Sequence, residues 1–156
     1  MTDTWPDRLA VRPLTVADAE RIATWTYDGP WEVYDSLPGD ELLTAEDGYL
    51  AVASGDELVG FCCTGMEARV PGQRAAPGVF DLGFGMDPRF VGAGHGLAFG
   101  TAIMEYLRRR HGPVTFRAVV QVWNKRSLGM IRKLGFTETD RLISDAVEYL
   151  VLRTEG

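Results

Sequence analysis

Cysteine and histidine are scarce in this chain of 156 residues, where each occurs only twice. The two cysteines, Cys62 and Cys63, are adjacent in a run with the composition of a strand, so their side chains are expected to point to opposite faces. Such a pair does not build a disulfide framework. A nucleophilic cysteine would also need a base, for which only His95 and His111 exist. The sequence therefore argues against a disulfide-stapled fold and against thiol catalysis.

Long apolar runs and an excess of positive charge are also missing. No apolar run approaches the roughly 18 residues that span a bilayer, and no charged-then-apolar leader opens the chain. The formal net charge is −6 and the isoelectric point is near 4.9. Nucleic acid and anionic membranes both select for basic surfaces. We therefore expect a cytoplasmic protein whose main partner is neither nucleic acid nor a membrane.

What the chain does contain is the composition of one globular unit. Hydrophobic residues make up 46% and charged residues 24%, and the length suits one well-buried domain, expected over residues 1–156. Periodicity and turn residues predict an α/β fold. The expected strands are 9–14, 49–53, 57–64, 79–86, 114–122, 138–143 and 147–153. The expected helical segments are 16–25, a short one around 31–37, 94–110, and one between Asn124 and Gly135.

The strand expected at 79–86 divides its residues unusually between its two faces. One face carries Phe80, Leu82, Phe84 and Met86, as a core face does. The other carries Asp81, Gly83 and Gly85, so it is almost bare backbone beside one carboxylate. Glycines inside a strand mark either a bulge or the close approach of another chain or a ligand. Both interpretations stay open here.

A turn with three alternating glycines, Gly92, Gly94 and Gly96, joins this strand to the next predicted helix. Glycines let backbone N–H groups approach an anion, and a helix N-terminus adds roughly half a positive charge. The turn therefore indicates a phosphate cradle; the alternative is a tight turn that binds nothing. The residues match neither a P-loop nor the dinucleotide fingerprint, because both spacings fail.

Two motifs together resemble the GNAT N-acetyltransferase superfamily. The first is Arg-x-x-Gly-x-Gly, starting at Arg89, and the second runs from Asn124 through Ser127 to Lys-Leu-Gly-Phe, ending at Phe136. The order of elements extends the resemblance over about residues 8–154. It implies a mixed, mostly antiparallel sheet of six to seven strands with about four helices. In such a fold the sheet is splayed between the strands at 79–86 and 114–122.

The resemblance implies acetyl-CoA as co-substrate and no metal. The pyrophosphate would bind the turn and the start of the helix, with Arg89 as a positive fork. Pantetheine would bond to backbone groups of Gly85 and Met86, and Asn124 and Ser127 would line the opposite wall, although both also suit an ordinary helix cap. Lys125 and Arg126 fit solvated surface better than phosphate contacts. The turn residues in question are Val91, Gly92, Ala93, Gly94, His95, Gly96 and Leu97.

In this family a primary amine attacks the thioester directly, so positioning dominates catalysis. The resemblance makes Asp81 the candidate base, acting through water, and the Met86 N–H the candidate oxyanion donor. Many relatives place a Tyr in the last helix as proton donor to the thiolate, but Ile131 stands there. The general acid is therefore unassigned, with Tyr106 and Tyr149 no more than guesses.

Residues 25–35 form the segment that in this family holds the acceptor. They include four aromatic and three acidic residues, and aromatic faces and carboxylates both attract ammonium groups. The alternative is that Trp25 and Trp31 simply belong to the core. The expected acceptor is a small cationic or amphipathic amine, or a peptide amine. The expected acceptor-binding residues are Trp25, Tyr27, Trp31 and Tyr34.

The leading functional hypothesis is therefore acetyl transfer from acetyl-CoA to a primary amine. A binding-only module that senses acyl-CoA is the main alternative, because the expected Tyr is missing. A different nucleotide ligand is a third, which the failed glycine patterns weaken. The sequence leaves open the acceptor, the acyl length and the oligomeric state, with a homodimer among the alternatives.

Overall fold

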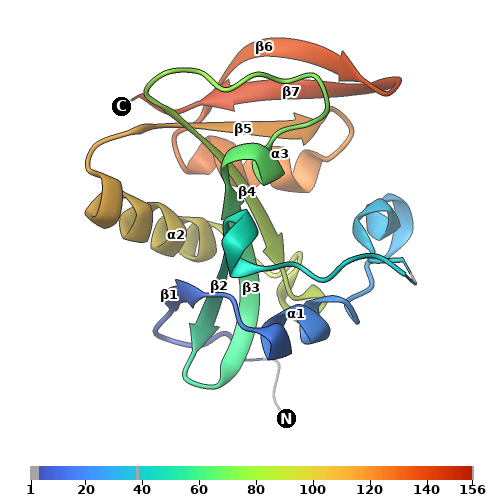
Figure 1. Cartoon of the computed structure of the whole chain (residues 1–156), viewed down its shortest axis with the longest axis vertical. Helices are drawn as coiled ribbons and strands as arrows, with labels where there is room; N and C mark the ends of the chain where they lie inside the picture. Colours follow the sequence, from blue (N-terminus) through green and yellow to red (C-terminus); the bar gives the residue numbers. More distant parts are fainter. Residues whose placement is uncertain (1–3, 38, 156) are drawn as a thin grey trace.

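The computed structural model describes residues 4–37 and 39–155 and has a single seven-stranded sheet, in the order β1-β2-β3-β4-β5-β7-β6 (Figure 1). The strands are β1 (Ala10–Pro13), β2 (Tyr49–Ser54), β3 (Glu57–Thr64), β4 (Val79–Met86), β5 (Thr115–Gln121), β6 (Thr137–Ser144) and β7 (Val147–Arg153). The α-helices are α1 (Val16–Ile22), α2 (Gly96–His111) and α3 (Lys125–Lys133). Four short 3-10 helices are η1 (Gly29–Tyr34), η2 (Ala45–Asp47), η3 (Gly65–Ala68) and η4 (Pro88–Phe90).

The sheet is mixed and mostly antiparallel, as predicted. Only β4 and β5 pair in parallel, and their ladder is short: Val79 to Asp81 face Thr115 to Arg117. Beyond these pairs β4 continues to Met86 and β5 to Gln121 with no further pairing between them. The predicted splay of the sheet therefore begins directly after Asp81.

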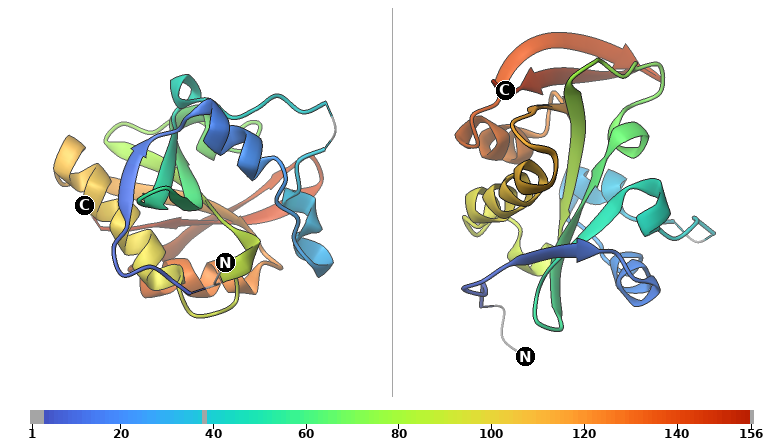
Figure 2. Two further views of the ribbon diagram at one scale, coloured as in Figure 1. Left: turned by 90° about the horizontal axis from the view of Figure 1, so that it is seen from below. Right: turned by 60° about the vertical axis from the view of Figure 1, so that its left-hand side comes forward.

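Helices cover the two faces of the sheet unequally. Figure 2 shows α2 and α3 together on one face, and α1 with η1 on the other. The larger core cluster joins α2 and α3 to the strands through residues such as Phe99, Ile131 and Phe116. A smaller cluster packs α1 on β2 and β3. The splay between β4 and β5 is therefore reached from both sides, by α2 and α3 on one and η1 on the other.

The start of α1 is fixed by the cap that the sequence predicts at Thr15. The Asp18 N–H donates to Thr15 Oγ1 at 3.1 Å, and the Thr15 N–H donates to Asp18 Oδ2 at 2.9 Å. Arg12 on β1 adds an ion pair to the same carboxylate, with Nη2 to Oδ1 at 3.1 Å. The Arg12 hydrogen bond, assisted by those from Thr15, lowers the pKa of Asp18 to about 2.

We expect Asp18→Asn to lower the free energy of unfolding by about 1 kcal/mol at pH 7, because it loses the charge that Arg12 and the cap recognise. Since the pKa of Asp18 is lower in the folded than in the unfolded protein, this stabilisation is present above about pH 4 and is lost as pH falls towards 2. Urea unfolding of both proteins at pH 7 and 2.5 measures it. The exposed Asp7→Asn is the control, and a gap that persists at pH 2.5 contradicts the assignment.

The helix boundaries differ from the predicted ones at three places. The first helix ends at Ile22 rather than at residue 25, and the helix expected around 31–37 is the 3-10 helix η1. The helix expected from Gly94 begins at Gly96, because Gly94 has φ = +86°, outside the right-handed helical region. This shift leaves Gly92 and Gly94 in a turn ahead of α2.

Cys62 and Cys63 are both buried and free. Burial raises the pKa of both thiols, that of Cys63 to about 12, so neither is a thiolate at neutral pH. The part of the chain that the structure describes contains no helix long and apolar enough to span a bilayer.

Candidate active site

The backbone of Met86 faces the splay between β4 and β5. The Asp87 N–H donates to the Val59 carbonyl of β3 at 2.8 Å. In an antiparallel ladder every second residue turns its N–H and C=O to the same neighbour. The groups of Gly85 therefore face its partner Phe61, whereas those of Met86 face away from β3. The geometry therefore does not support the predicted pantetheine contact at Gly85, and Met86 is the residue with backbone groups directed into the splay.

Tyr27 reaches the same point from the segment before η1. Its hydroxyl donates to the Met86 carbonyl at 2.7 Å, and its own N–H donates to the Asp35 carboxylate at 2.8 Å. Burial raises the pKa of the Tyr27 phenol, and the charges of Asp87 and Asp35 raise it further, so the phenol stays a neutral donor. Tyr27 thus ties the predicted acceptor segment to β4 beside the Met86 N–H.

Asp87 and Arg89 hold the turn that leaves β4. The buried Asp87 carboxylate accepts from the Arg89 N–H at 2.9 Å and caps η4. The Arg89 guanidinium pairs with Asp87 at 3.0 Å and with Glu57 at 3.4 Å. Both pairs tie the guanidinium to carboxylates of the protein, so the geometry does not support its predicted role as a fork for the pyrophosphate. Its charge instead stabilises the turn.

The glycine turn, residues 91–96, ends at an open helix N-terminus. Gly92 and Gly94 have φ of +77° and +86°, values that side chains other than glycine's rarely adopt. His95 is the N-cap of the 16-residue α2, and its side chain makes no capping hydrogen bond. The first intrahelical bond runs from the Phe99 N–H to the His95 carbonyl at 3.0 Å. The N–H groups before Phe99, including that of the exposed Leu97, are therefore free of helical partners and suit an anion.

Aromatic side chains pack together beside the glycine turn. The His95 imidazole stacks on Trp5, with ring centroids 4.5 Å apart and planes inclined by 4°, and Trp5 also meets the edge of Phe90 at 5.1 Å. A side chain at Gly96 would come within 2.7 Å of Met130 on α3, so this glycine serves helix packing. Sequence reasoning missed Trp5, because nothing in its local pattern indicates a partner 90 residues away.

Asn124 lies on the other side of the splay and is 97% buried. Its Oδ1 accepts from the Ser127 N–H at 3.2 Å and from the indole N–H of Trp31 at 3.0 Å. Its amide donates to the hydroxyls of Tyr34 at 3.0 Å and Ser127 at 3.1 Å. These four bonds use its two donors and both acceptor lone pairs. The geometry therefore does not support the predicted direct contact of Asn124 with pantetheine; Asn124 caps α3 and bonds to two residues of η1.

Three of the four predicted acceptor residues meet at the splay: Tyr27 on the β4 side, and Trp31 and Tyr34 on Asn124. The fourth, Trp25, is only 7% exposed and stacks on Phe61 in the smaller core cluster. Trp25 is therefore a core residue, as the alternative interpretation held. Trp123, which sequence reasoning missed, packs against Trp31 at 5.7 Å and Tyr34 at 6.2 Å between ring centroids.

A hollow of about 230 Å³ joins the acceptor segment to the glycine turn. Its walls include Asp28 and Trp31 on one side, Pro88 and Val91 on another, and Arg126 from the first turn of α3. Arg126, predicted to be solvated, thus faces both the turn and η1. The hollow therefore brings together the acceptor segment, the start of the glycine turn and a positively charged side chain.

Asp81 lies outside this hollow, on the paired part of β4. Its carboxylate accepts from Arg69 at 2.8 Å and from Arg117 at 3.0 Å, and the residue is 2% exposed. Arg117 also donates to the Arg74 carbonyl at 2.7 Å, which fastens the loop after β3 over this site. A buried carboxylate enclosed by two guanidinium groups is not accessible to a substrate amine. The geometry therefore does not support the predicted role of Asp81 as the base and favours a structural role.

The general acid remains unassigned. Ile131 is buried in the core, and Tyr106 lies under the Arg110 guanidinium on α2. The Tyr34 hydroxyl accepts from Asn124 at the start of α3, and its pKa is raised by burial and by Tyr149, against a lowering by its bond to Asn124.

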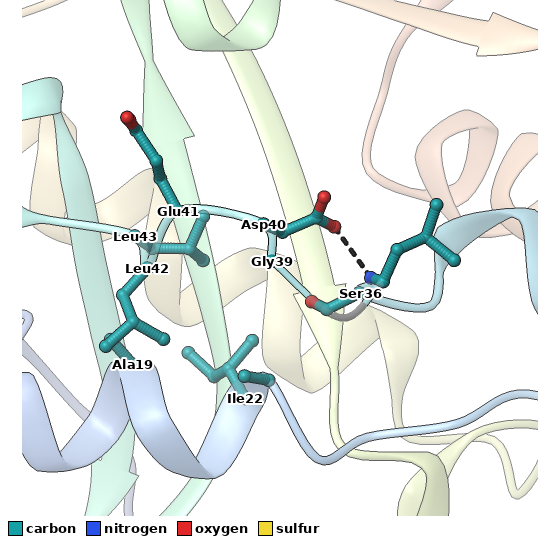
Figure 3. Close-up of a pocket in the computed structure, with 10 residues that line it drawn as sticks. Ala19, Ile22, Ser36, Gly39, Asp40, Glu41, Leu42 and Leu43 are labelled. Atoms are coloured by element: carbon teal, nitrogen blue, oxygen red, sulfur yellow. Dashed lines mark hydrogen bonds between the residues drawn. The ribbon is translucent and has the colours of Figure 1, made fainter.

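A second hollow of about 350 Å³ lies between α1 and the chain that follows η1 (Figure 3). Ala19, Ile22, Leu42 and Leu43 line it, and the Asp40 carboxylate at its edge accepts from the Leu37 N–H at 2.7 Å. None of the predicted site residues lines this hollow, so it plays no part in the arrangement described above.

Comparison with known proteins identifies the family. The model of the acetyltransferase (GNAT) domain matches residues 8–137. Among curated proteins no sequence relative was found. Similar solved structures include AAC(6')-Ib in complex with ribostamycin and coenzyme A, at 15% identity and TM-score 0.73, covering 95% of this chain and 93% of that one.

Two further solved structures each cover 94% of both chains. One is a spermidine N-acetyltransferase SpeG chimera from Vibrio cholerae and hSSAT, at 13% identity and TM-score 0.69, and the other is a GNAT-family acetyltransferase from Bacillus anthracis, at 16% and 0.68. At these identities the likeness shows the shared fold. The family model, which spans most of the chain, shows that this acyltransferase belongs to the GNAT acetyltransferase family.

Proposed function

We propose that the protein transfers an acetyl group from acetyl-CoA to a primary amine of a small cationic or peptide acceptor, by direct attack in a ternary complex. One observation carries the proposal: the glycine turn, which leads into the uncapped N-terminus of α2, lines at Val91 the same hollow that the aromatic segment lines at Trp31. The first suits a diphosphate and the second an amine. Membership of the family, and neighbours whose titles name coenzyme A, support acetyl-CoA as the donor.

In this proposal the diphosphate binds the N–H groups of residues 91–97, and the pantetheine arm runs along the splay past Ser127 to Met86. The Met86 N–H, directed into the splay, donates to the thioester oxygen as it becomes an oxyanion. Oxyanion donors of this kind are worth about 3 kcal/mol. Gly85, Arg89 and Asn124 take no direct part, because their polar groups have other partners.

The chemistry follows from these positions. The neutral amine attacks the carbonyl carbon, the new C–N bond forms, the C–S bond breaks, and coenzyme A leaves as a thiolate. The attacking nitrogen loses one proton as it becomes an amide, and this proton passes through water to the thiolate. The proton lost by the ammonium group passes to water, because Asp81 is enclosed by Arg69 and Arg117. Holding both reactants in one geometry then supplies most of the acceleration. Turnover should accordingly rise with pH towards the pKa of the acceptor amine.

The acceptor is proposed to be cationic or amphipathic because of what surrounds η1. Asp28 and Glu32 are exposed there, and the net charge of −6 steers cations towards the protein. The rings of Trp31, Tyr34 and Trp123 offer faces to an ammonium group. The names of two structural neighbours, an aminoglycoside acetyltransferase and a spermidine N-acetyltransferase, favour amines of this class.

The experiment that tests the function is a free-thiol assay with acetyl-CoA and a panel of polyamines, aminoglycosides, amino acids and peptides. The expected result is amine-dependent thiol release together with a rise in Tm on adding acetyl-CoA. A rise in Tm with no release for any amine favours the acyl-CoA sensor instead, which the enclosure of Asp81 keeps in consideration. No change in Tm overturns both.

Tyr34→Leu is expected to raise the KM of a cationic acceptor about tenfold, since a cation over an aromatic face contributes about 0.5–2 kcal/mol. Tyr34→Phe keeps the ring and loses only the hydroxyl bond to Asn124, so the KM for the acceptor should rise less. Steady-state kinetics at saturating acetyl-CoA measure both. Equal effects of the two variants would show that the hydroxyl, not the ring, matters.

Four further statements stay predictions. They are the extent of the acyl-CoA-binding domain over residues 1–156, the location in the cytoplasm, the independence from metal, nucleic acid and membranes, and a homodimer among the oligomeric states.

A further inference from the structure

The Arg126 side chain lies between η1 and the glycine turn, in the wall of the smaller hollow. It is exposed in the first turn of α3, and its guanidinium carbon lies 4.0 Å from the centre of the Trp31 ring. The indole N–H of Trp31 donates to Asn124, which is the N-cap of α3, the helix that carries Arg126. The guanidinium therefore has one face covered by η1, while its N–H groups lie in the plane of the fork.

The same guanidinium lies against the glycine turn. A side chain at Gly92 would stand 3.6 Å from both the guanidinium carbon and Nη2 of Arg126. Gly92 has φ = +77°, a backbone conformation that residues with side chains rarely adopt, and the distance of 3.6 Å is an ordinary van der Waals contact. Arg126 thus lies against Gly92 within the turn whose N–H groups suit an anion.

The positive charge of Arg126 lies at the N-terminus of α3, where it is unfavourable unless an anion binds nearby. Lys125 and Arg126 both lie in the first turn of α3, which contains no acidic residue. A helix N-terminus carries about half a positive charge, so cations there are destabilising. Within residues 4–37 and 39–155 no carboxylate forms an ion pair with Arg126. A diphosphate at the turn would offset both the helix charge and the guanidinium charge.

We propose that Arg126 is a positioning residue shared by the two substrates: its N–H groups bind the diphosphate of coenzyme A while its face holds Trp31. Binding of the diphosphate fixes the guanidinium and thereby orders the acceptor segment, residues 26–35. The proposal rests on the proposed function for the identity of the anion. Its consequence is that the cofactor raises the affinity for the amine, which favours binding of acetyl-CoA first.

The test is hydrogen–deuterium exchange followed by mass spectrometry, with coenzyme A and with pantetheine, which lacks the diphosphate. In the wild type, coenzyme A should slow exchange at least fivefold both in residues 91–97 and in residues 26–35. Pantetheine should leave residues 26–35 unchanged. In Arg126→Gln, coenzyme A at saturation should still protect residues 91–97 and no longer protect residues 26–35.

Two variants separate positioning from charge alone. Arg126→Lys keeps a cation for the phosphate but lacks the planar face, so it should retain most of the affinity for coenzyme A and lose the protection of residues 26–35. Arg132→Gln removes an exposed arginine from the last turn of the same helix and should behave like the wild type. In kinetics, Arg126→Lys should raise the acceptor KM with little change in the KM for acetyl-CoA.

Three results would overturn the inference. Protection of residues 26–35 that persists in Arg126→Gln would show that the coupling does not pass through this side chain. Faster exchange of that segment with coenzyme A would show that the ligand displaces η1 rather than ordering it. Protection of neither region would refute the proposed function and the coupling together, whereas protection of residues 91–97 alone in the wild type refutes only the coupling.

Discussion

Asp81→Asn is expected to lower the free energy of unfolding by about 3 to 5 kcal/mol, the cost of breaking a buried ion pair by removing one partner. The variant keeps the size of the side chain but leaves Arg69 and Arg117 without the charge that they enclose. Arg117 is itself buried, so water cannot replace the carboxylate. Urea unfolding at pH 7 measures the loss.

The same variant decides between a structural and a catalytic Asp81. Removal of a general base costs about 10²- to 10⁴-fold in rate. We expect the turnover of folded Asp81→Asn, normalised by its coenzyme A binding, to stay within about threefold of wild type. Glu148→Gln is the matched control, because its ion pair with Arg141 is exposed and is worth less than about 1 kcal/mol. A stable Asp81→Asn protein that has lost turnover would restore the carboxylate to the mechanism.

Gly94→Asp should weaken the binding of coenzyme A at least 100-fold. The position has φ = +86° and open space around it, so an aspartate side chain fits, and Asp adopts this backbone region more readily than most residues. Its carboxylate would stand at the turn where the diphosphate is proposed to bind, and would repel it while also occupying the helix N-terminus. Isothermal titration with coenzyme A measures the change.

Two matched variants isolate the charge. Gly94→Asn has nearly the same shape without the charge, and should lose about tenfold or less. Gly72→Asp places the same residue at φ = +88°, again in open space, but in the loop between β3 and β4. It should bind coenzyme A as the wild type does. Equal binding by Gly94→Asp and wild type would place the anion site elsewhere.

Most helices and strands could be predicted because the residues that indicate them lie close together in the sequence. The strand at 79–86 and the strand at 147–153 were predicted to the residue, since glycine and proline turns bound the first and a two-residue turn precedes the second. The cap at Thr15 needs only residues three positions apart, and it was predicted too. The start of α2 was misplaced by two residues because a glycine's φ is not visible in its sequence context.

The sequence indicated the backbone turn of the candidate site but not its side-chain pairings. The glycine turn follows from local pattern and the Met86 N–H from the resemblance to the family, and the roles of both stay predictions. The pairing of Asp81 with Arg69 and Arg117 was not predicted, because these partners lie 12 and 36 positions away. The bonds of Asn124 to Trp31 and Tyr34 span 93 and 90 positions. Pairings at such separations are set by tertiary packing, which no spacing rule encodes.

The short ladder between β4 and β5 has a consequence for how the chain folds. β1 to β4 pair with sequence neighbours, and β6 with β7 forms a second local unit, so two cooperative blocks can form separately. Three residue pairs and the ion pair of Asp81 with Arg117 join them along the sheet. Contacts between residues far apart in the sequence form slowly, so the pairing of β4 with β5 is expected to form late in folding. In native-state hydrogen exchange the same pairing is expected to open first. The splay where we propose that the ligand binds would thus be the boundary between two folding units.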